Sequence, residues 1–343
     1  MKRLSLEKNA AVLVTDEAER LYFTGFHSTF GRLIVADSPV FFTDARYYAA
    51  AKAQIEGAEV VLSSDLSSVK EALSQRGIRS LGLDYQVTTV AEYRAVEALG
   101  IPLFDASPLL NRAMAVKTEE EIGLIAASCK ITQESLYAAL PVIKEGVSER
   151  EVAAEIEFNM KMRGASKVSF DPIVAFGENA AVPHHETGDR RLKKNECVLM
   201  DIGCIYRGYC SDMTRTVFYG EPTEDFSRAY DAVLASARRA EDGIAAGMTG
   251  IRADAFARDY LKEQGLAAYF THSLGHGVGV NIHEYPYLAP KRDNVLEDNM
   301  VFSIEPGVYF DEAFGIRIED TVCLSGGKVR RLFTDDKKLM ILK

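Results

Sequence analysis

The sequence predicts a two-domain protein, with an α/β domain at the N-terminus and a larger α+β domain after it. Short β-rich runs alternate with helical stretches over the first part of the chain, as expected where helices cover a sheet. Pro102 and Pro108 mark an irregular exit from this region, and Thr118 begins a long helix soon after them. We therefore predict an N-terminal domain over residues 1–112 and a second domain over residues 113–343.

The N-terminal domain is predicted from four apolar runs and three helical stretches. The β-rich runs are AAVLV (10–14), RLIVA (32–36), VFFT (40–43) and EVVLS (59–63). Helices are expected near residues 46–56, 66–76 and 88–99.

The second domain is predicted to begin with a long helix that is buried along one face. Thr118 and Glu121 have the spacing of a capping box, in which each side chain accepts a hydrogen bond from the other residue's backbone N–H. Residues that recur at helical spacing would form the buried face: Ile122, Ile125, Cys129, Thr132, Leu136 and Leu140.

An internal duplication is predicted within the second domain. Residues 146–164 (GVSEREVAAEIEFNMKMRG) and 247–265 (GMTGIRADAFARDYLKEQG) are helical segments of equal length with glycine at each end. Each has a hydroxyl residue suited to cap the helix, Ser148 or Thr249. Chance similarity of two ordinary helices is the alternative. Duplication would give two half-domains related by pseudo-twofold symmetry, with a site between them.

Two hairpins that follow these segments each carry a pair of acids. Asp201 and Asp212 are symmetric about the Tyr206–Arg207 bond, within the β-rich segments VLMDIG and YCSDMTRTVF. Glu305 and Glu319 are symmetric about Glu312, within VFSIEPGVYF and GIRIEDTVCL.

Facing acids in apolar strands would repel one another and would be costly to bury, unless cations bind between them. The alternative is four independent surface acids, which are common in a chain with 50 Asp and Glu. Because the paired symmetry occurs twice in strongly apolar surroundings, we interpret the four acids as one two-metal hydrolase site.

Histidines provide the remaining candidate ligand. His272, His276 and His283 lie in HSLGHGVGVNIHEYP (272–286), where three glycines make a helix unfavourable and an extended segment that approaches a metal favourable. His184 and His185 lie in GENAAVPHHE (177–186).

Four segments of the second domain resemble those of the pita-bread metallopeptidases: MDIGCIYRGYCSDMTRT, HSLGHGVGVNIHEYP, FSIEPGVY and GIRIEDT. In the first domain, LYFTGF (21–26) and FFTDARYY (41–48) resemble the N-terminal domain of the prolidase and aminopeptidase P group. Methionine aminopeptidases share the pita-bread fold but generally lack so large an N-terminal domain, and creatinase does not keep the five metal ligands. The resemblance implies a creatinase/prolidase-like α/β domain followed by an α+β pita-bread catalytic domain.

The resemblance also implies a metal site with five ligands. Asp201 would chelate one metal, Asp212 and Glu319 would bridge two metals, and His276 and Glu305 would each complete one coordination shell. Oxygen-rich ligands without thiolate favour two divalent ions such as Mn²⁺, with Co²⁺, Zn²⁺ or Fe²⁺ as alternatives.

Further residues match substrate-binding and supporting positions of the family. His184 would bind the substrate and stabilise its transition state, with His185 as the alternative because the two are adjacent. His283 would contact the scissile carbonyl or the attacking water, and His272 and Arg317 would support the site. Glu305 would also carry the proton from the water to the leaving nitrogen.

The activity implied is hydrolysis of the Xaa-Pro bond at the N-terminus of proline-containing dipeptides or oligopeptides. Dipeptidase and aminopeptidase remain alternatives, with Lys291 or Arg292 as partners for a dipeptide carboxylate in the first case. A catalytically silent pita-bread protein that only binds peptides is the rival outside the enzyme class.

Composition is consistent with a peptidase and argues against a protein that binds nucleic acid or a membrane. The formal charge of −10 provides no basic surface for nucleic acid or an anionic membrane. No apolar run is long enough to span a bilayer, and the N-terminus lacks a signal-peptide core. The five cysteines form no CxxC pair, so we expect buried thiols, with a redox role for Cys204 and Cys210 as the alternative. We expect a cytoplasmic enzyme, and the resemblance implies a homodimer.

Overall fold

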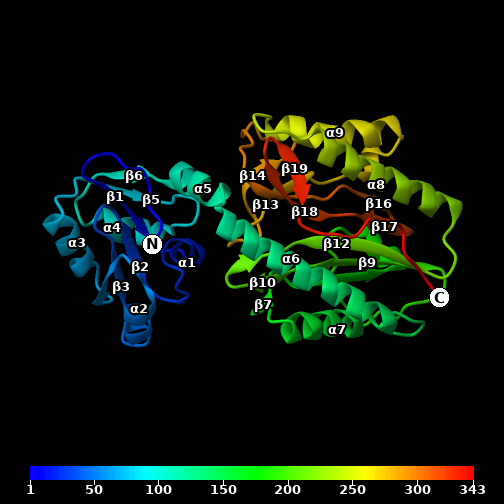
Figure 1. The fold of residues 1–343 in the computed structure, drawn as a ribbon, viewed down its shortest axis with the longest axis horizontal. Coiled ribbons are helices and arrows are strands. Elements are labelled where there is room, and N and C mark those ends of the chain that lie inside the picture. Colours follow the sequence, from blue (N-terminus) through cyan, green and yellow to red (C-terminus); the bar gives the residue numbers. More distant parts are fainter. The chain divides into compact units, whose positions relative to one another are not determined.

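Residues 1–343 are described by the structure, a computed structural model, in which Met1–Met114 and Ala115–Lys343 form separate units (Figure 1). Each unit has its own sheets and its own apolar core. The predicted order, an α/β unit followed by a larger α+β unit, is confirmed.

The N-terminal unit is built on a six-stranded sheet in the order β4-β3-β2-β1-β5-β6. Its strands are β1 (Ala10–Val14), β2 (Arg32–Val35), β3 (Val40–Thr43), β4 (Glu59–Leu62), β5 (Ser80–Leu83) and β6 (Leu103–Asp105). Its helices are α1 (Glu17–Thr24), α2 (Tyr48–Gln54), α3 (Leu66–Gln75), α4 (Val90–Glu97) and α5 (Ser107–Ala115). Strands β1–β3 form an antiparallel meander, whereas β4, β5 and β6 join by parallel pairing.

The four predicted strands of this unit are confirmed as β1–β4, and the three predicted helices as α2–α4. Three further elements, α1, β5 and β6, were not predicted from the sequence. A signal for α1 was present at Asp16, whose carboxylate accepts hydrogen bonds from the backbone N–H groups of Ala18 and Glu19.

Four long helices accompany the strands of the C-terminal unit: α6 (Glu119–Ala139), α7 (Glu149–Met162), α8 (Glu224–Gly243) and α9 (Gly250–Glu263). The predicted capping box of Thr118 and Glu121 is confirmed at the start of α6. The predicted N-caps are confirmed too, since Ser148 begins α7 and Thr249 begins α9. Three short 3₁₀ helices also occur: Leu140–Val142, Gly177–Ala181 and Ala267–Tyr269.

The strands of the C-terminal unit form four sheets. One contains β8 (Ile173–Phe176), β9 (Glu196–Ile202), β12 (Met213–Tyr219) and β20 (Ile341–Leu342). A second contains β13 (Gly275–Gly277), β14 (Glu284–Leu288), β15 (Val301–Ile304), β18 (Asp320–Ser325) and β19 (Lys328–Arg331). The short sheets contain β7 (Lys167–Val168), β10 (Cys204–Tyr206) and β11 (Tyr209–Cys210), and β16 (Gly307–Phe310) with β17 (Phe314–Arg317).

Strand β9 shows how these sheets lie between two layers of helices. Cys197 and Leu199 belong to the apolar core that includes α8 and α9, whereas Val198 and Met200 belong to the core that includes α6 and α7. Because side chains alternate along a strand, β9 is buried on both faces. In Figure 1 the strands accordingly run between the α6–α7 pair and the α8–α9 pair.

The five cysteines are free and buried, as the sequence analysis expected of packed thiols. Of the helices, none is both long enough and apolar enough to cross a membrane. The pseudo-twofold repeat stays a prediction.

Candidate metal centre

The five predicted metal ligands line one cavity of about 470 Å³ in the C-terminal unit. Asp201 lies in β9, Asp212 directly precedes β12, and His276 lies in β13. Glu305 follows β15 and Glu319 precedes β18. The fold therefore brings together acids and an imidazole from segments that are spread over more than one hundred residues of the chain.

The predicted register of the first hairpin is wrong by two residues. Asp201 lies opposite Thr214 in the β9–β12 pair, not opposite Asp212. Arg207 and Gly208 both have positive φ, 48° and 86°, so the tight turn is centred one residue later than the sequence analysis assumed. A shift of two residues preserves the face to which side chains point. Asp212 therefore still reaches the same cavity as Asp201.

The predicted register of the second hairpin is confirmed. Its strands pair about Glu312, which has a positive φ of 57°, and Ile304 lies opposite Asp320. Glu305 and Glu319 are the next pair of residues toward the turn on the two arms of the hairpin, and both side chains line the cavity.

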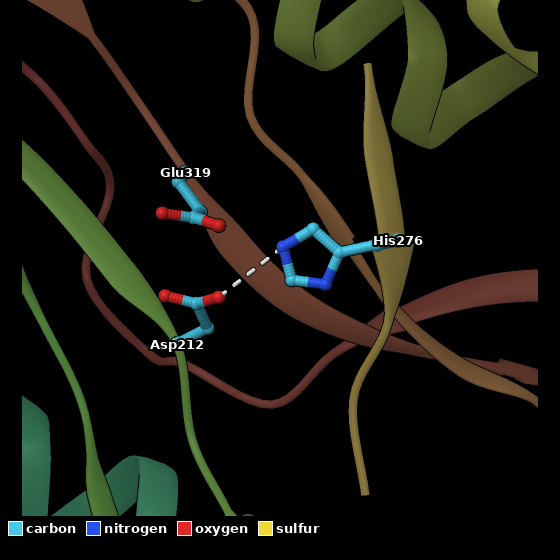
Figure 2. Close-up of side chains that lie close together, drawn as sticks. All are labelled: Asp212, His276 and Glu319. Carbon is cyan, nitrogen blue, oxygen red and sulfur yellow. Dashed lines mark ion pairs between the residues drawn. The ribbon is translucent and has the colours of Figure 1, made fainter. Parts of the chain in front are cut away.

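Three of the ligands form a close cluster. Figure 2 shows the polar ends of Asp212, His276 and Glu319 facing one another, and one donor atom from each lies within 4.8 Å of the others. His276 Nε2 is 3.5 Å from Asp212 Oδ2 and 3.3 Å from Glu305 Oε1. Glu305 thus joins the cluster through the same imidazole.

The electrostatics of the cluster are unfavourable for ionised acids. Burial, followed by the charges of the neighbouring carboxylates, raises the pKa of Asp212 and of Glu319 well above the ordinary range. Burial also raises the pKa of Asp201, although Arg317 opposes the change. Asp201 Oδ1 is buried and has no hydrogen-bond partner.

Glu305 is the exception among the four acids. Burial alone would raise its pKa, but the hydrogen bond and charge of His276 outweigh burial and lower it to about 2. Burial tends to lower the pKa of His276, and Glu305 raises it in return. The two side chains therefore form an ion pair at the edge of the cluster.

This donor set fits divalent cations. Four buried carboxylates around one imidazole repel one another, and a partnerless oxygen of Asp201 points to a missing electropositive neighbour. Carboxylate oxygens and an imidazole nitrogen, with no thiolate among them, are the ligands of hard and borderline metals.

Arg317 makes hydrogen bonds along the outer side of the cavity, and its role as a supporting residue stays a prediction. Its Nη2 donates to Asp201 Oδ2 (2.6 Å), its Nη1 to the Tyr309 hydroxyl (2.7 Å) and its Nε to Thr214 Oγ1 (3.0 Å). The Thr214 hydroxyl then donates to Glu319 Oε2 (2.6 Å). Arg317 therefore orients two candidate ligands, one directly and one through a threonine. Tyr309 and Thr214 were not predicted as site residues, although both lie inside segments that resemble those of the pita-bread metallopeptidases.

The geometry distinguishes the two adjacent histidines. His184 lines the cavity of the ligands, whereas His185 Nε2 lies 2.9 Å from Glu149 Oε2 at the start of α7. His283 also lines the cavity, and its ring meets the His276 ring edge to face at 4.3 Å between centroids. Burial, followed by the charge of His276, lowers the pKa of His283.

His272 lies in the wall of the same cavity. Its Nε2 is 2.8 Å from the Tyr309 hydroxyl, which also accepts from Arg317. Burial lowers the pKa of His272, which favours the neutral imidazole. The supporting role of His272 stays a prediction.

The suggested carboxylate partners of a dipeptide do not line the cavity. Lys291 and Arg292 are exposed, and the Arg292 guanidinium lies 5.0 Å from the centre of the Tyr287 ring. Tyr287 itself lines the cavity, so Arg292 contacts a lining ring without being part of the lining.

A buried ion network beneath the centre was not predicted. Arg215 on β12 is 1% exposed and donates to both oxygens of Asp335, each at 2.7 Å, and to Asp320 Oδ1 at 2.7 Å. Its Nη1 donates to the backbone carbonyls of Glu319 (2.6 Å) and Thr214 (2.9 Å). This arginine therefore connects the C-terminal segment to the backbone of a candidate metal ligand.

The fold and the cluster together define a metallopeptidase catalytic domain preceded by a separate α/β domain. The sequence model of metallopeptidase family M24 matches residues 123–325, and that of the creatinase/prolidase N-terminal domain matches residues 2–114. The chain belongs to metallopeptidase family M24.

Relatives and solved structures cover almost all of the chain. The Xaa-Pro dipeptidase of Pyrococcus horikoshii is 35% identical, over 98% of this chain and 96% of its own. The structure of the Xaa-Pro dipeptidase from Bacillus anthracis aligns with a TM-score of 0.93 and 37% identity, over 97% of this chain and 95% of that one. The X-Pro aminopeptidase from Thermotoga maritima aligns with a TM-score of 0.91 and 30% identity, over 97% and 95% of the two chains.

Proposed function

We propose that this protein is a metal-dependent exopeptidase that hydrolyses the Xaa-Pro bond at the N-terminus of short peptides. The observation that carries the proposal is the convergence of four carboxylates and one imidazole on a single cavity. Membership of metallopeptidase family M24, and relatives named as Xaa-Pro dipeptidases and an X-Pro aminopeptidase, support the same activity.

The proposed ligands of two divalent cations are Asp201, Asp212, His276, Glu305 and Glu319. Mn²⁺ is the proposed metal because oxygen ligands dominate the set. When bound, such cations lower the pKa of a water and polarise a carbonyl oxygen.

The side chains of the protein would carry out the remaining steps. The Glu305 carboxylate accepts a proton from the attacking water and passes it to the prolyl nitrogen as the carbon–nitrogen bond breaks. His184 and His283, which line the cavity, donate hydrogen bonds to the substrate carbonyl as negative charge develops on its oxygen. His272 and Arg317 hold Tyr309 and Asp201 in place.

Hydrolysis of Ala-Pro and Ala-Pro-Ala in Mn²⁺, with a chelated control, tests the activity. Metal-dependent release of alanine from either peptide would support the proposal. Metal binding without cleavage of either peptide would contradict it and would favour a pita-bread protein that only binds peptides. Cleavage of Ala-Pro alone would identify a dipeptidase, and preference for Ala-Pro-Ala would identify an aminopeptidase.

We also propose the finer points that the resemblance implied. Residues 1–112 form an N-terminal domain and residues 113–343 the catalytic domain. The enzyme is a homodimer that works in the cytoplasm, where free buried thiols such as its five cysteines persist. Light scattering that gives the mass of one chain would contradict the dimer.

A further inference from the structure

A second, larger cavity adjoins the metal cavity. It has a volume of about 980 Å³ and lies between α7, the segment 165–172 around β7, and the segment 184–187. Asp171 and His184 line both cavities. Helix α7 and strand β7 contact each other, and Figure 1 shows them side by side. A molecule bound at His184 would therefore lie where the lining of the metal cavity meets the lining of this groove.

The metal cavity by itself is poorly suited to a free carboxylate next to proline. Arg317 is the single arginine or lysine among its lining residues. All three of its nitrogens already donate, to Asp201, Tyr309 and Thr214. An Xaa-Pro dipeptide would place its terminal carboxylate one residue from the scissile bond, where no free guanidinium or ammonium group lines the cavity.

The groove, in contrast, provides an available cation. Of its three Arg and Lys side chains, Arg150 is paired with Asp189 (2.9 Å) and Lys161 donates to the carbonyl of Ser166. Lys167 is exposed in the groove, and no carboxylate of the protein forms an ion pair with it. Its ammonium group is free to bind a carboxylate that enters from the metal cavity.

The groove also provides an apolar surface. Phe158 on α7 lines it with 59% of its surface exposed, beside Ala154 and Pro172. Glu157 and Glu186 also line the groove, so a bound peptide would meet both acidic and basic side chains. A mixed surface of this kind suits a peptide backbone with apolar side chains.

We propose that this groove binds the part of a peptide substrate that follows proline, with Phe158 packing against its side chains and Lys167 pairing with its terminal carboxylate. The protein would then act on tripeptides and longer peptides in preference to dipeptides. This inference rests on the proposed Xaa-Pro exopeptidase activity and names the substrate class of the same site.

The first test compares kcat/KM for Ala-Pro, Ala-Pro-Ala and Ala-Pro-Leu-Leu in Mn²⁺. The native protein should prefer the longer peptides. Phe158→Ala should lower the ratio of kcat/KM for Ala-Pro-Leu-Leu to that for Ala-Pro by about tenfold, mainly through KM. Met162→Ala is the matched control, since Met162 is 69% exposed one helical turn further along α7 and does not line the groove.

The second test isolates the carboxylate contact. Lys167→Gln should raise KM for Ala-Pro-Leu-Leu about fivefold, as expected for one partly exposed ion pair. It should leave KM unchanged for the same peptide with a C-terminal amide, which has no carboxylate to pair. Equal effects on acid and amide would overturn the assigned contact.

A third measurement does not depend on turnover. Phe158→Cys introduces an exposed thiol into a chain whose own cysteines are all buried. Ala-Pro-Leu-Leu added to the metal-free protein should slow its alkylation, whereas the thiol of Met162→Cys should react at the same rate with or without the peptide.

The outcomes separate this inference from the proposed function. Cleavage of Ala-Pro as efficient as that of the longer peptides, with no change in the Phe158 variant, would overturn the groove and leave the exopeptidase intact. Absence of Mn²⁺-dependent cleavage of all three peptides would overturn the exopeptidase itself, and unslowed alkylation would then overturn the groove as well.

Discussion

Replacement of Arg215 by methionine should destabilise the C-terminal unit and weaken metal binding together. Methionine has a similar length but no donors, so Asp335 would lose both hydrogen bonds from Arg215 and keep only its 3.6 Å contact with Arg331, and the carbonyl of Glu319 would lose its donor. Both acids of the network are almost completely buried, since the side chains of Asp320 and Asp335 are 0% and 8% exposed.

The expected loss in the free energy of unfolding depends on which contacts the two aspartates keep after Arg215 is replaced. Removal of one partner from a buried ion pair typically costs about 3–5 kcal/mol. Asp320 would keep its contacts with Arg331 and Lys337, so we expect the lower end, about 3 kcal/mol. For a unit of this size, about 2–4 °C of Tm is lost per kcal/mol, which gives a decrease of about 6–12 °C.

Thermal unfolding followed by calorimetry, with and without Mn²⁺, measures this change, and titration calorimetry measures the Kd for the metal. Arg238→Met is the matched control, because Arg238 is exposed and makes one 3.3 Å hydrogen bond to the carbonyl of Asp336. That variant should stay within about 0.5 kcal/mol of the native protein. A Tm for the Arg215 variant that matches the control, with an unchanged Kd for Mn²⁺, would refute the reasoning.

Three further outcomes are expected. Chelation should lower Tm and Mn²⁺ should restore it, because free metal at about 100 times its Kd adds about 2.7 kcal/mol to the free energy of unfolding; superimposable melting curves would contradict a preformed site. Glu305→Gln should reduce kcat by a factor of about 10²–10⁴ with an unchanged circular dichroism spectrum, and near-native turnover would exclude Glu305 as the proton carrier. In the N-terminal unit, burial, followed by the hydrogen bond to Asp84, raises the pKa of Glu19 from 4.5 to about 9. Glu19 therefore keeps its proton in the folded chain and loses it in the unfolded chain, so its contribution is complete below pH 4.5 and is lost as the pH rises to about 9. The loss is about 1.4 kcal/mol per pH unit. Glu19→Gln does not titrate, so its Tm should rise relative to the native protein between pH 6 and pH 8.5, and parallel pH profiles would disprove the assignment.

Much of the secondary structure could be predicted from the sequence because its signals are local. The capping residues Thr118, Ser148 and Thr249 each begin a helix where expected, since a hydroxyl beside free backbone N–H groups acts within one turn. Strands β5 and β6 were missed because they are short and their apolar runs are interrupted. Their place in the sheet depends on parallel pairing with segments that are distant in the sequence.

The candidate site was predictable in its ligands but not in its details. Acids in apolar segments are conspicuous in a sequence because burying a carboxylate is costly, and Asp201 and Asp212 were identified on this basis. Their predicted pairing was nevertheless two residues out of register. The register depends on the turn, where Arg207 adopts a left-handed backbone conformation. Arginine rarely adopts this conformation, so the position of the turn could not be predicted from the residue type.

The sequence by itself determined which side chains are able to hold a metal and where most helices begin, because both depend on residue type and on near neighbours. Only the tertiary structure decided that His184 faces the cavity while His185 is held by Glu149. It alone showed that Arg215 reaches across about one hundred residues of sequence to the backbone of Glu319. Such choices depend on packing between segments that are far apart in the chain, and no local preference of the backbone encodes them.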